Sequence, residues 1–299
     1  MFENSDKFNS ILTQYAKGAY LNPGDDTDLT RLFFPTLGVD EARGEYDIWN
    51  TKAALSAVNT SMARDNTPRR IQLDRTIGVY NCAPHALEIS RSAFNDMQKS
   101  GSRYQEAQLR TLMSAQFASR QTDTVAAVKA AKAAENSLGA WTGNANADVI
   151  GEIEQLCHNV VTGTGSKPTD IVIGHTAWTK LRNHAAIASR INGISYALPE
   201  EAFLSLLAYK GIKLTVVDSM TMVNGTMTEL LANDIIVMHN QEAPTVSDMS
   251  FGKEFTLSPD GPEVLSYDEH GGVNKVDSLL WSSDCKVTNA AALSRLVVS

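Results

Sequence analysis

The sequence predicts an α+β protein in which a compact α/β unit is inserted into a second domain built from a long helix and extended strands. Helices and short apolar strands alternate over residues 148–240, which is typical of an α/β unit. A long helical pattern precedes this unit, and alternating apolar and polar residues flank the whole arrangement. With 299 residues and 43% hydrophobic residues, the chain can bury a sizeable core in one large domain or two moderate ones.

The composition excludes several classes of protein. A net charge of -8, from 34 acidic and 26 basic side chains, argues against a basic nucleic-acid reader. Because no apolar run reaches the roughly 18 residues of a membrane helix and the start lacks a signal-peptide pattern, we expect a cytosolic protein. Three distant cysteines and six histidines form no metal-binding spacing. We therefore expect free thiols, no metal and no cofactor.

The first part of the chain predicts an arm and a long loop. Apolar residues at helical spacing predict a short amphipathic helix over residues 6–20, whose apolar face an isolated subunit would leave unpacked. An extended segment is expected to begin at residues 31–35. Alternating residues in 45–50 and 70–82 predict two strands joined by a polar connection.

The connection between these strands carries Arg64, Arg69 and Arg70 on an otherwise acidic protein. Such a cluster can be a solvated loop, or it can reach the acidic face of a neighbouring subunit, where charge complementarity fixes the register. A nucleic-acid contact is weaker, since so few positive charges neutralise few phosphates. The solvated loop and the subunit contact both stay open.

Residues 84–136 predict helical structure in two parts. The first covers residues 84–94, and the second follows a Ser-Gly-Ser break at 100–102. A helix of about 30 residues spans ~45 Å and can act as a spine. A change in composition at residues 137–147 predicts a linker into the inserted unit.

The inserted unit has clear local signals for each element. Thr176 is expected to cap a helix, and Asn224 with Gly225 is a strong signal for a two-residue hairpin turn. The predicted helices cover residues 148–161, 176–184 and 199–209, and the predicted strands cover 171–173, 212–217 and 235–237. The tail, residues 241–299, predicts further strands that we group with the domain of the long helix.

No catalytic motif stands out. Residues 163–167 (Gly-Thr-Gly-Ser-Lys) resemble a phosphate loop only faintly, because they follow a helix and precede a strand, so a helix end and turn is the better interpretation. Asp25, Asp26 and Asp28 lack the glycine and glutamate of a calcium loop and are expected in turns and caps. The sequence therefore predicts no enzyme.

One segment resembles the major capsid proteins of tailed bacteriophages. It contains Pro168, a short apolar strand at 171–173, Gly174, and then Trp178 and Leu181. The resemblance continues at Trp141, residues 148–153, Asp218 and residues 233–237. The order of arm, loop, long helix, inserted unit and closing strands also matches the plan of that family over about 280 residues.

The resemblance implies a shell subunit with the fold shared by tailed-phage capsids, herpesvirus shell floors and encapsulins. It divides the chain into an N-terminal arm (1–43), an extended loop (44–75), a peripheral domain with a spine helix (76–140 and 241–299) and an axial domain (141–240). The arm and loop are expected to lie across neighbouring subunits. Asn224 and Gly225 are expected at an axial tip that contacts other subunits, as Arg64, Arg69 and Arg70 are in the loop.

The function implied is a major capsid protein that forms hexamers and pentamers of an icosahedral head around double-stranded phage DNA. The expected partners are other copies, a separate scaffolding protein, a portal, a possible decoration protein, and packaged DNA without sequence-specific binding. No membrane and no covalent crosslink between subunits are expected. An encapsulin-type compartment shell is the main alternative, and a cytosolic α/β enzyme is a weaker one.

Overall fold

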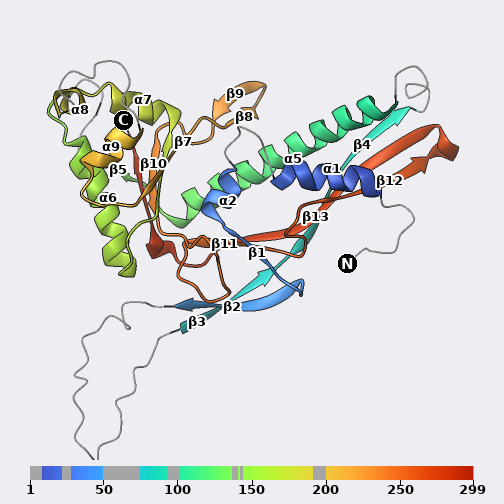
Figure 1. Ribbon diagram of the computed structural model, residues 1–299, viewed down its shortest axis with the longest axis horizontal. Helices are drawn as coiled ribbons and strands as arrows, with labels where there is room; N and C mark the ends of the chain where they lie inside the picture. Colours follow the sequence, from blue (N-terminus) through green and yellow to red (C-terminus); the bar gives the residue numbers. More distant parts are fainter. Residues whose placement is uncertain are drawn as a thin grey trace, which may run out of the picture.

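The computed structural model describes residues 9–21, 28–49, 75–92, 101–136, 141, 144–190 and 200–298. Its two five-stranded sheets have the strand orders β1-β11-β13-β12, with β4 on β13, and β5-β14-β10-β6-β7. Figure 1 shows that the long helix α5 runs along the first sheet and that the second sheet lies at the other end of the molecule with its own helices. The mixed helices and sheets confirm the predicted α+β class.

The spine helix α5 covers Gly101–Ala131, close to its predicted length. Its apolar side chains Leu109 and Leu112 are buried toward the first sheet, and Val125 and Val128 belong to a second cluster further along. The first sheet contains β1 (Thr36–Gly38), β4 (Ala83–Ser92), β11 (Gly252–Thr256), β12 (Glu263–Glu269) and β13 (Asn274–Val287). A 3-10 turn, η1 (His270–Gly272), joins β12 to β13.

The predicted helix over residues 84–94 is wrong, because this segment contains strand β4. All ten residues of β4 pair with β13. Leu87, Ile89 and Arg91 point inward at every second position, while residues between them are exposed. The helical prediction failed because pairing with a strand nearly 200 residues away outweighed local propensity.

The inserted unit has the predicted helices and strands. Asp148 caps α6 (Val149–Thr164) by accepting a hydrogen bond from the Gly151 backbone N–H at 3.1 Å, and the helix ends at Gly165 in the left-handed conformation. The other elements are β5 (Glu135–Asn136), β6 (Asp170–Gly174), α7 (His175–Arg182), α8 (Ala185–Arg190), α9 (Glu200–Leu206), β7 (Lys213–Val217), β8 (Met220–Val223), β9 (Thr226–Glu229) and β10 (Asp234–Met238).

Two details of this unit differ from the predictions. Gly174, not Thr176, is the N-cap of α7, and the Thr176 hydroxyl instead donates to the Glu229 carboxylate at 2.9 Å. The strand β14 (Leu293–Val297), which follows the turn η2 (Ala290–Ala292), pairs with β10 in the second sheet, although the sequence grouped it with the spine helix. Local patterns do not identify the partner of a strand that returns from the far end of the chain.

The arm contains α1 (Ser10–Leu21) and α2 (Leu29–Phe33). The first helix was expected, but α2 lies where the sequence predicted an extended segment. Asp28 accepts hydrogen bonds from the backbone N–H groups of Thr30 and Arg31, which stabilises the first turn of α2. Leu29 and Phe33, one turn apart, are both fully buried. Capping and burial therefore favour this short helix.

The predicted strands of the extended loop are confirmed at its base. β2 (Arg43–Trp49) pairs antiparallel with β3 (Arg75–Asn81) over seven residue pairs. This two-stranded ladder projects from the lower edge of the molecule in Figure 1. Residues 50–74 lie outside the described part of the chain.

Candidate assembly surfaces

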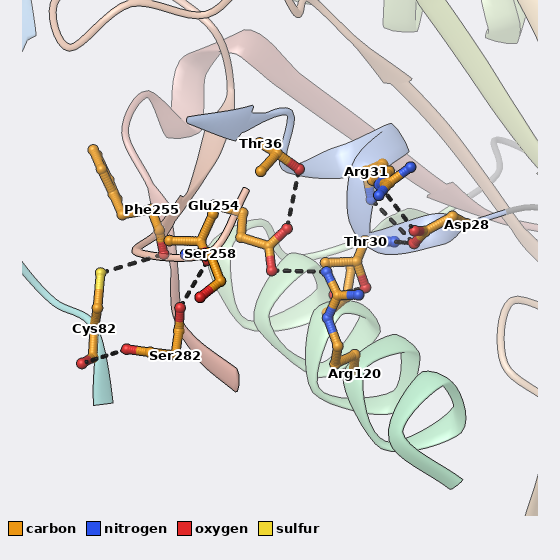
Figure 2. A network of polar contacts seen from close by, with 12 residues as sticks. Asp28, Thr30, Arg31, Thr36, Cys82, Arg120, Glu254, Phe255, Ser258 and Ser282 are labelled. Carbon is orange, nitrogen blue, oxygen red and sulfur yellow. Dashed lines mark hydrogen bonds and ion pairs between the residues drawn. The ribbon is translucent and has the colours of Figure 1, made fainter. Parts of the chain in front are cut away.

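The arm is held on its own subunit through Glu254, a strand residue that is almost fully buried. The Arg120 guanidinium of α5 donates to Glu254 Oε1 at 2.7 Å, and the Thr36 hydroxyl of β1 donates to Oε2 at 3.2 Å. Figure 2 shows this carboxylate between the spine helix and the arm. One side chain thus joins three segments that are far apart in the sequence. We call Arg120, Glu254 and Thr36 the arm latch.

The charged state of the arm latch is favoured by its geometry. Burial works to lower the pKa of Arg120, but the charge of Glu254, together with smaller contributions from Tyr20, Asp28 and Cys285, outweighs burial, and the pKa lies above its ordinary value. The Tyr20 ring lies near both Arg31 and Arg120, whose guanidinium carbons are 4.4 and 5.1 Å from the ring centroid. The end of α1 is therefore tied to α2 and to the spine helix.

Further polar contacts hold α2. The hydroxyl oxygens of Thr30 and Thr124 lie 3.0 Å apart, and the side-chain amide of Asn240 donates to the carbonyls of Leu32 and Phe33 at 3.0 and 3.2 Å. Because these bonds are buried and directional, they fix the position of α2 and not only its burial.

The amphipathic helix α1 also packs within its own subunit. Leu12 and Ala16 contact Leu109 of α5 and Val264 of β12 in one buried cluster. The expectation that an isolated subunit leaves this helix unpacked is therefore wrong for its main apolar face. Ile11 and Leu21 are the exceptions, since their side chains are exposed.

The ladder of β2 and β3 has an inner and an outer face. On the inner face the Tyr80 ring stacks on Phe255 with centroids 4.4 Å apart, and Tyr46 lies 5.3 Å from the same ring. A Cβ at Gly78 would lie only 2.3 Å from Tyr46, so glycine allows the ring to cover the strand. The outer face exposes Ile77 and Val79. The base of the loop is therefore anchored, with an apolar surface turned outward.

The hairpin of β8 and β9 has the predicted turn. Asn224 and Gly225 have φ values of 51° and 81°, as a two-residue hairpin turn with two left-handed residues requires. Both residues are exposed at the tip, which lies above α5 in Figure 1. Their contact with other subunits remains a prediction. Arg64, Arg69 and Arg70 lie outside the described residues.

Arg120 and Glu254 were not found from the sequence. A single charged residue within a helix or strand gives no sign that its partner lies 134 residues away. The strand β11 reads Gly-Lys-Glu-Phe-Thr, and its adjacent Lys253 and Glu254 indicate buried charge only once the strand is known to be fully buried. In that strand both side chains are fully or almost fully buried.

The described residues offer little for catalysis. Among them, no group of three or more His, Cys, Asp or Glu side chains is arranged to hold a metal. Burial raises the pKa of Cys82 to about 11 and that of Cys157 to about 12, so neither thiol is an activated nucleophile. Gly165 ends α6 before a strand, which agrees with a helix end and turn at residues 163–167.

The buried histidine of the inserted unit is fully hydrogen-bonded. His184 Nδ1 accepts from the Ala186 backbone N–H at 3.2 Å, and Nε2 lies 2.9 Å from the Asn144 carbonyl oxygen. Both ring nitrogens therefore have partners within the subunit, and the ring stabilises the chain around Trp141 instead of offering a free ligand.

Comparisons with known proteins agree with a shell subunit. Residues 127–251 match the family model described as phage major capsid protein E. A search of curated proteins finds no match. The matched region covers the end of α5 and the inserted unit and stops just before β11, and it includes the segment that resembles capsid proteins in the sequence.

Solved structures match over nearly the whole chain. A phage-related protein from Bordetella bronchiseptica RB50 is 13% identical, with a TM-score of 0.72 and 98% of both chains covered. The capsid of Myoviridae phage XM1 is 12% identical, with a TM-score of 0.53 over 91% of this chain and 92% of that one. A virus-like particle from Pyrococcus furiosus is 9% identical, with a TM-score of 0.56 over 98% and 100%.

At these identities the structures establish the fold, and the family match adds the kind of protein that uses it. The match to a phage capsid family favours a virus shell over a compartment shell. The chain has the shell fold of tailed-phage capsid subunits, and its fold and family match together support a phage capsid shell protein.

Proposed function

We propose that this chain is the major capsid protein of a tailed phage, and that its copies form hexamers and pentamers of an icosahedral head around double-stranded DNA. The observation that carries the proposal is the capsid family match at residues 127–251 within a chain that matches a phage capsid structure over 91% of its length. Closed rings of one subunit require head-to-tail contacts, and an extended loop with an exposed outer face supplies such a contact.

We further propose the division into arm (1–43), extended loop (44–75), peripheral domain (76–140 and 241–299) and axial domain (141–240). The two sheets support two units, which meet in one shared apolar cluster, and β14 is the part of residues 241–299 that pairs in the second sheet. In this division Arg64, Arg69, Arg70, Asn224 and Gly225 contact neighbouring subunits.

The proposed partners are other copies, a separate scaffolding protein, a portal and a decoration protein. Packaged DNA would be enclosed without sequence-specific binding, which a net charge of -8 supports because the surface has no excess of cations. Assembly would take place in the host cytoplasm and the product would be the virion. No helix in the described part of the chain is both long and apolar enough to cross a membrane.

The proposed protein is structural and not an enzyme. A shell subunit needs interfaces instead of a reactive centre, and the buried thiols and hydrogen-bonded histidine support this assignment. The contents of the particles distinguish the two kinds of shell. An encapsulin-type shell would enclose a protein cargo, whereas a phage head would enclose DNA.

The test is expression of the chain alone and with candidate scaffold genes, followed by light scattering and negative-stain electron microscopy. We expect closed shells, or hexamers and pentamers that convert to shells. A subunit that stays monomeric or dimeric with every scaffold would contradict the proposal.

In the same assay, Arg69→Glu with Arg70→Glu should lower shell yield if these residues contact a neighbour, and an unchanged yield would remove them from the interface.

A further inference from the structure

One face of the hairpin of β8 and β9 carries three methionines together with Glu229, the cross-strand partner of Met220. Met222 pairs directly with Met227, and Met220 lies two residues before Met222 on the same strand. Because cross-strand partners and alternate residues share a face, these three side chains lie on one side of the hairpin. We call Met220, Met222 and Met227 the methionine face.

The opposite face of the hairpin is turned toward the spine helix. It carries Thr221, and the Thr221 hydroxyl lies 3.4 Å from the Thr122 hydroxyl of α5. Thr226 and Thr228 lie on this same face by register. The helix side therefore carries three threonines and Val223, which is 49% exposed, and the methionine face is directed away from α5.

This arrangement reverses the usual order of polar and apolar residues. The exposed fractions are 49% for Met220, 69% for Met222 and 57% for Met227. A hairpin that packed only on its own subunit would place methionines against the helix and threonines in water. An exposed apolar face of this kind indicates a contact with another protein surface.

The same chain has a second set of exposed apolar side chains, on the outer face of the ladder of β2 and β3. Ile77 is 48% exposed and Val79 is 61% exposed, and they lie opposite Asp47 and Glu45 of β2. The aromatic inner face of the ladder is buried on Phe255. Figure 1 shows the ladder and the β8–β9 hairpin on opposite long edges of the molecule, with α5 between them. Two different apolar surfaces on opposite edges are what a head-to-tail contact between identical subunits requires.

We propose that the methionine face of one subunit receives the outer face of the β2–β3 ladder, centred on Ile77 and Val79, of a second copy of this chain. The proposal rests on the proposed function and names a surface through which the rings would close. Rings of five and six subunits set neighbours at different angles, and the unbranched methionine side chain adapts to such changes better than a branched one. A stable interface needs about 800 Å² from each partner, so this contact would be the apolar centre of a larger one.

The first test is an intersubunit disulfide between Val79→Cys and Met222→Cys in assembled particles. Mild oxidation should give covalent multimers larger than a dimer on a non-reducing gel, since every subunit carries both halves of the contact. The matched control pairs Val79→Cys with Thr226→Cys, which lies beside the same turn but on the opposite face of the hairpin. The unsubstituted chain, with its three native cysteines, controls for background.

The second test replaces Met222 and Met227 with serine, with Thr226→Ser and Thr228→Ser as the control on the other face. Because these methionines are exposed, circular dichroism of the unassembled subunit should not change. We expect the subunit concentration needed for assembly to rise about tenfold for the methionine variant and to stay constant for the control.

Particles that form normally without the Val79→Cys and Met222→Cys crosslink, or that crosslink equally in the control pair, would overturn the inference and leave the capsid function standing. Unchanged assembly of the serine variant would do the same and would assign the methionine face to a different protein. If the unsubstituted chain never assembles, the proposed function fails and this inference fails with it.

Discussion

The core of the inserted unit and the strands of the first sheet bury different kinds of side chain. The main core of the inserted unit is apolar, with Ile153, Leu156 and Ile171 fully or almost fully buried. The strands of the first sheet take part in buried ion pairs: Arg120 with Glu254, Arg91 with Asp277, and Lys253 with Asp248. The side chains of Glu254 and Lys253 are 1% and 0% exposed.

This difference shows two ways of joining segments. Apolar packing joins segments at any distance along the chain, as where Leu12 meets Val264, and it tolerates small shifts in orientation. The ion pairs of Arg120 with Glu254 and of Arg91 with Asp277 also join distant segments, but each pair accepts only a narrow geometry. An arm and a loop that reach neighbouring subunits need fixed positions, and directional contacts provide them. Variants of the arm latch therefore give the most direct test of the difference between the two kinds of core.

The largest effect is expected for Glu254→Ala. Removing this carboxylate leaves the buried Arg120 charge without its partner, so the free energy of unfolding should fall by roughly 3–5 kcal/mol. Urea unfolding of the unassembled subunit, followed by circular dichroism, measures the change.

The matched control is the double variant Arg120→Met with Glu254→Leu. Replacing both charges with apolar side chains of similar size should leave stability within about 1 kcal/mol of the unchanged chain, or raise it. If the single and double variants lose the same stability, the latch acts through packing and not through its charges.

Substitutions in the core of the inserted unit should lower stability as they do in an ordinary apolar core. Ile153→Ala removes a fully buried side chain and leaves a cavity, which should lower the free energy of unfolding by about 2–5 kcal/mol. Ile153→Val should cost only about 0.5–1.5 kcal/mol in the same urea assay. A loss of stability that grows with the number of atoms removed at Ile153 would distinguish this core from the arm latch, where stability depends on whether both charges are kept or removed. Equal losses for Ile153→Ala and Ile153→Val would contradict this distinction.

A smaller, pH-dependent effect is expected at Asp248. Burial alone raises the pKa of this carboxyl, but hydrogen bonds from Ser250 and Thr245 and the charge of Lys253 outweigh burial, and the pKa lies below its ordinary value. The charged carboxylate therefore stabilises the fold above about pH 4, and this contribution is lost as the pH falls from there through the lowered pKa.

Asp248→Asn should lower the free energy of unfolding at pH 7 by roughly 1.5–3 kcal/mol and should flatten its decline between about pH 5 and pH 3. Urea titrations at several pH values measure both features. Asp260→Asn, which neutralises an exposed carboxylate, is the matched control. An unaltered acid profile in Asp248→Asn would show that this carboxylate does not contribute to the loss of stability in acid.

Elements with strong local signals could be predicted from the sequence. The spine helix, α6 with its Asp148 cap, and the Asn224 and Gly225 turn are each specified by residues within a few positions of one another. The strand β4 and the helix α2 could not be predicted in the same way. In β4 the pairing with β13 decides the conformation, and in α2 burial against the spine helix and β11 does.

The proposed assembly surfaces divide along the same line. Two adjacent residues, Asn224 and Gly225, specify the turn at the tip of the β8–β9 hairpin. The methionine face can be recognised only from the structure, where the register places Met222 opposite Met227 and α5 lies on the other side of the hairpin. The sequence predicts subunit contacts at the arginine cluster and at the hairpin tip. It does not single out Ile77, Val79 or the methionines as surface residues.

By itself the sequence determined the α+β class, the long helix, the order of parts and the resemblance to capsid proteins, because helical and strand periodicities and turn residues are local properties of the chain. Only the tertiary structure decided that β14 lies in the second sheet, that Glu254 joins the arm to the spine helix, and which apolar side chains remain uncovered. These features depend on contacts between residues tens to hundreds of positions apart, and such contacts exist only after the whole chain has folded.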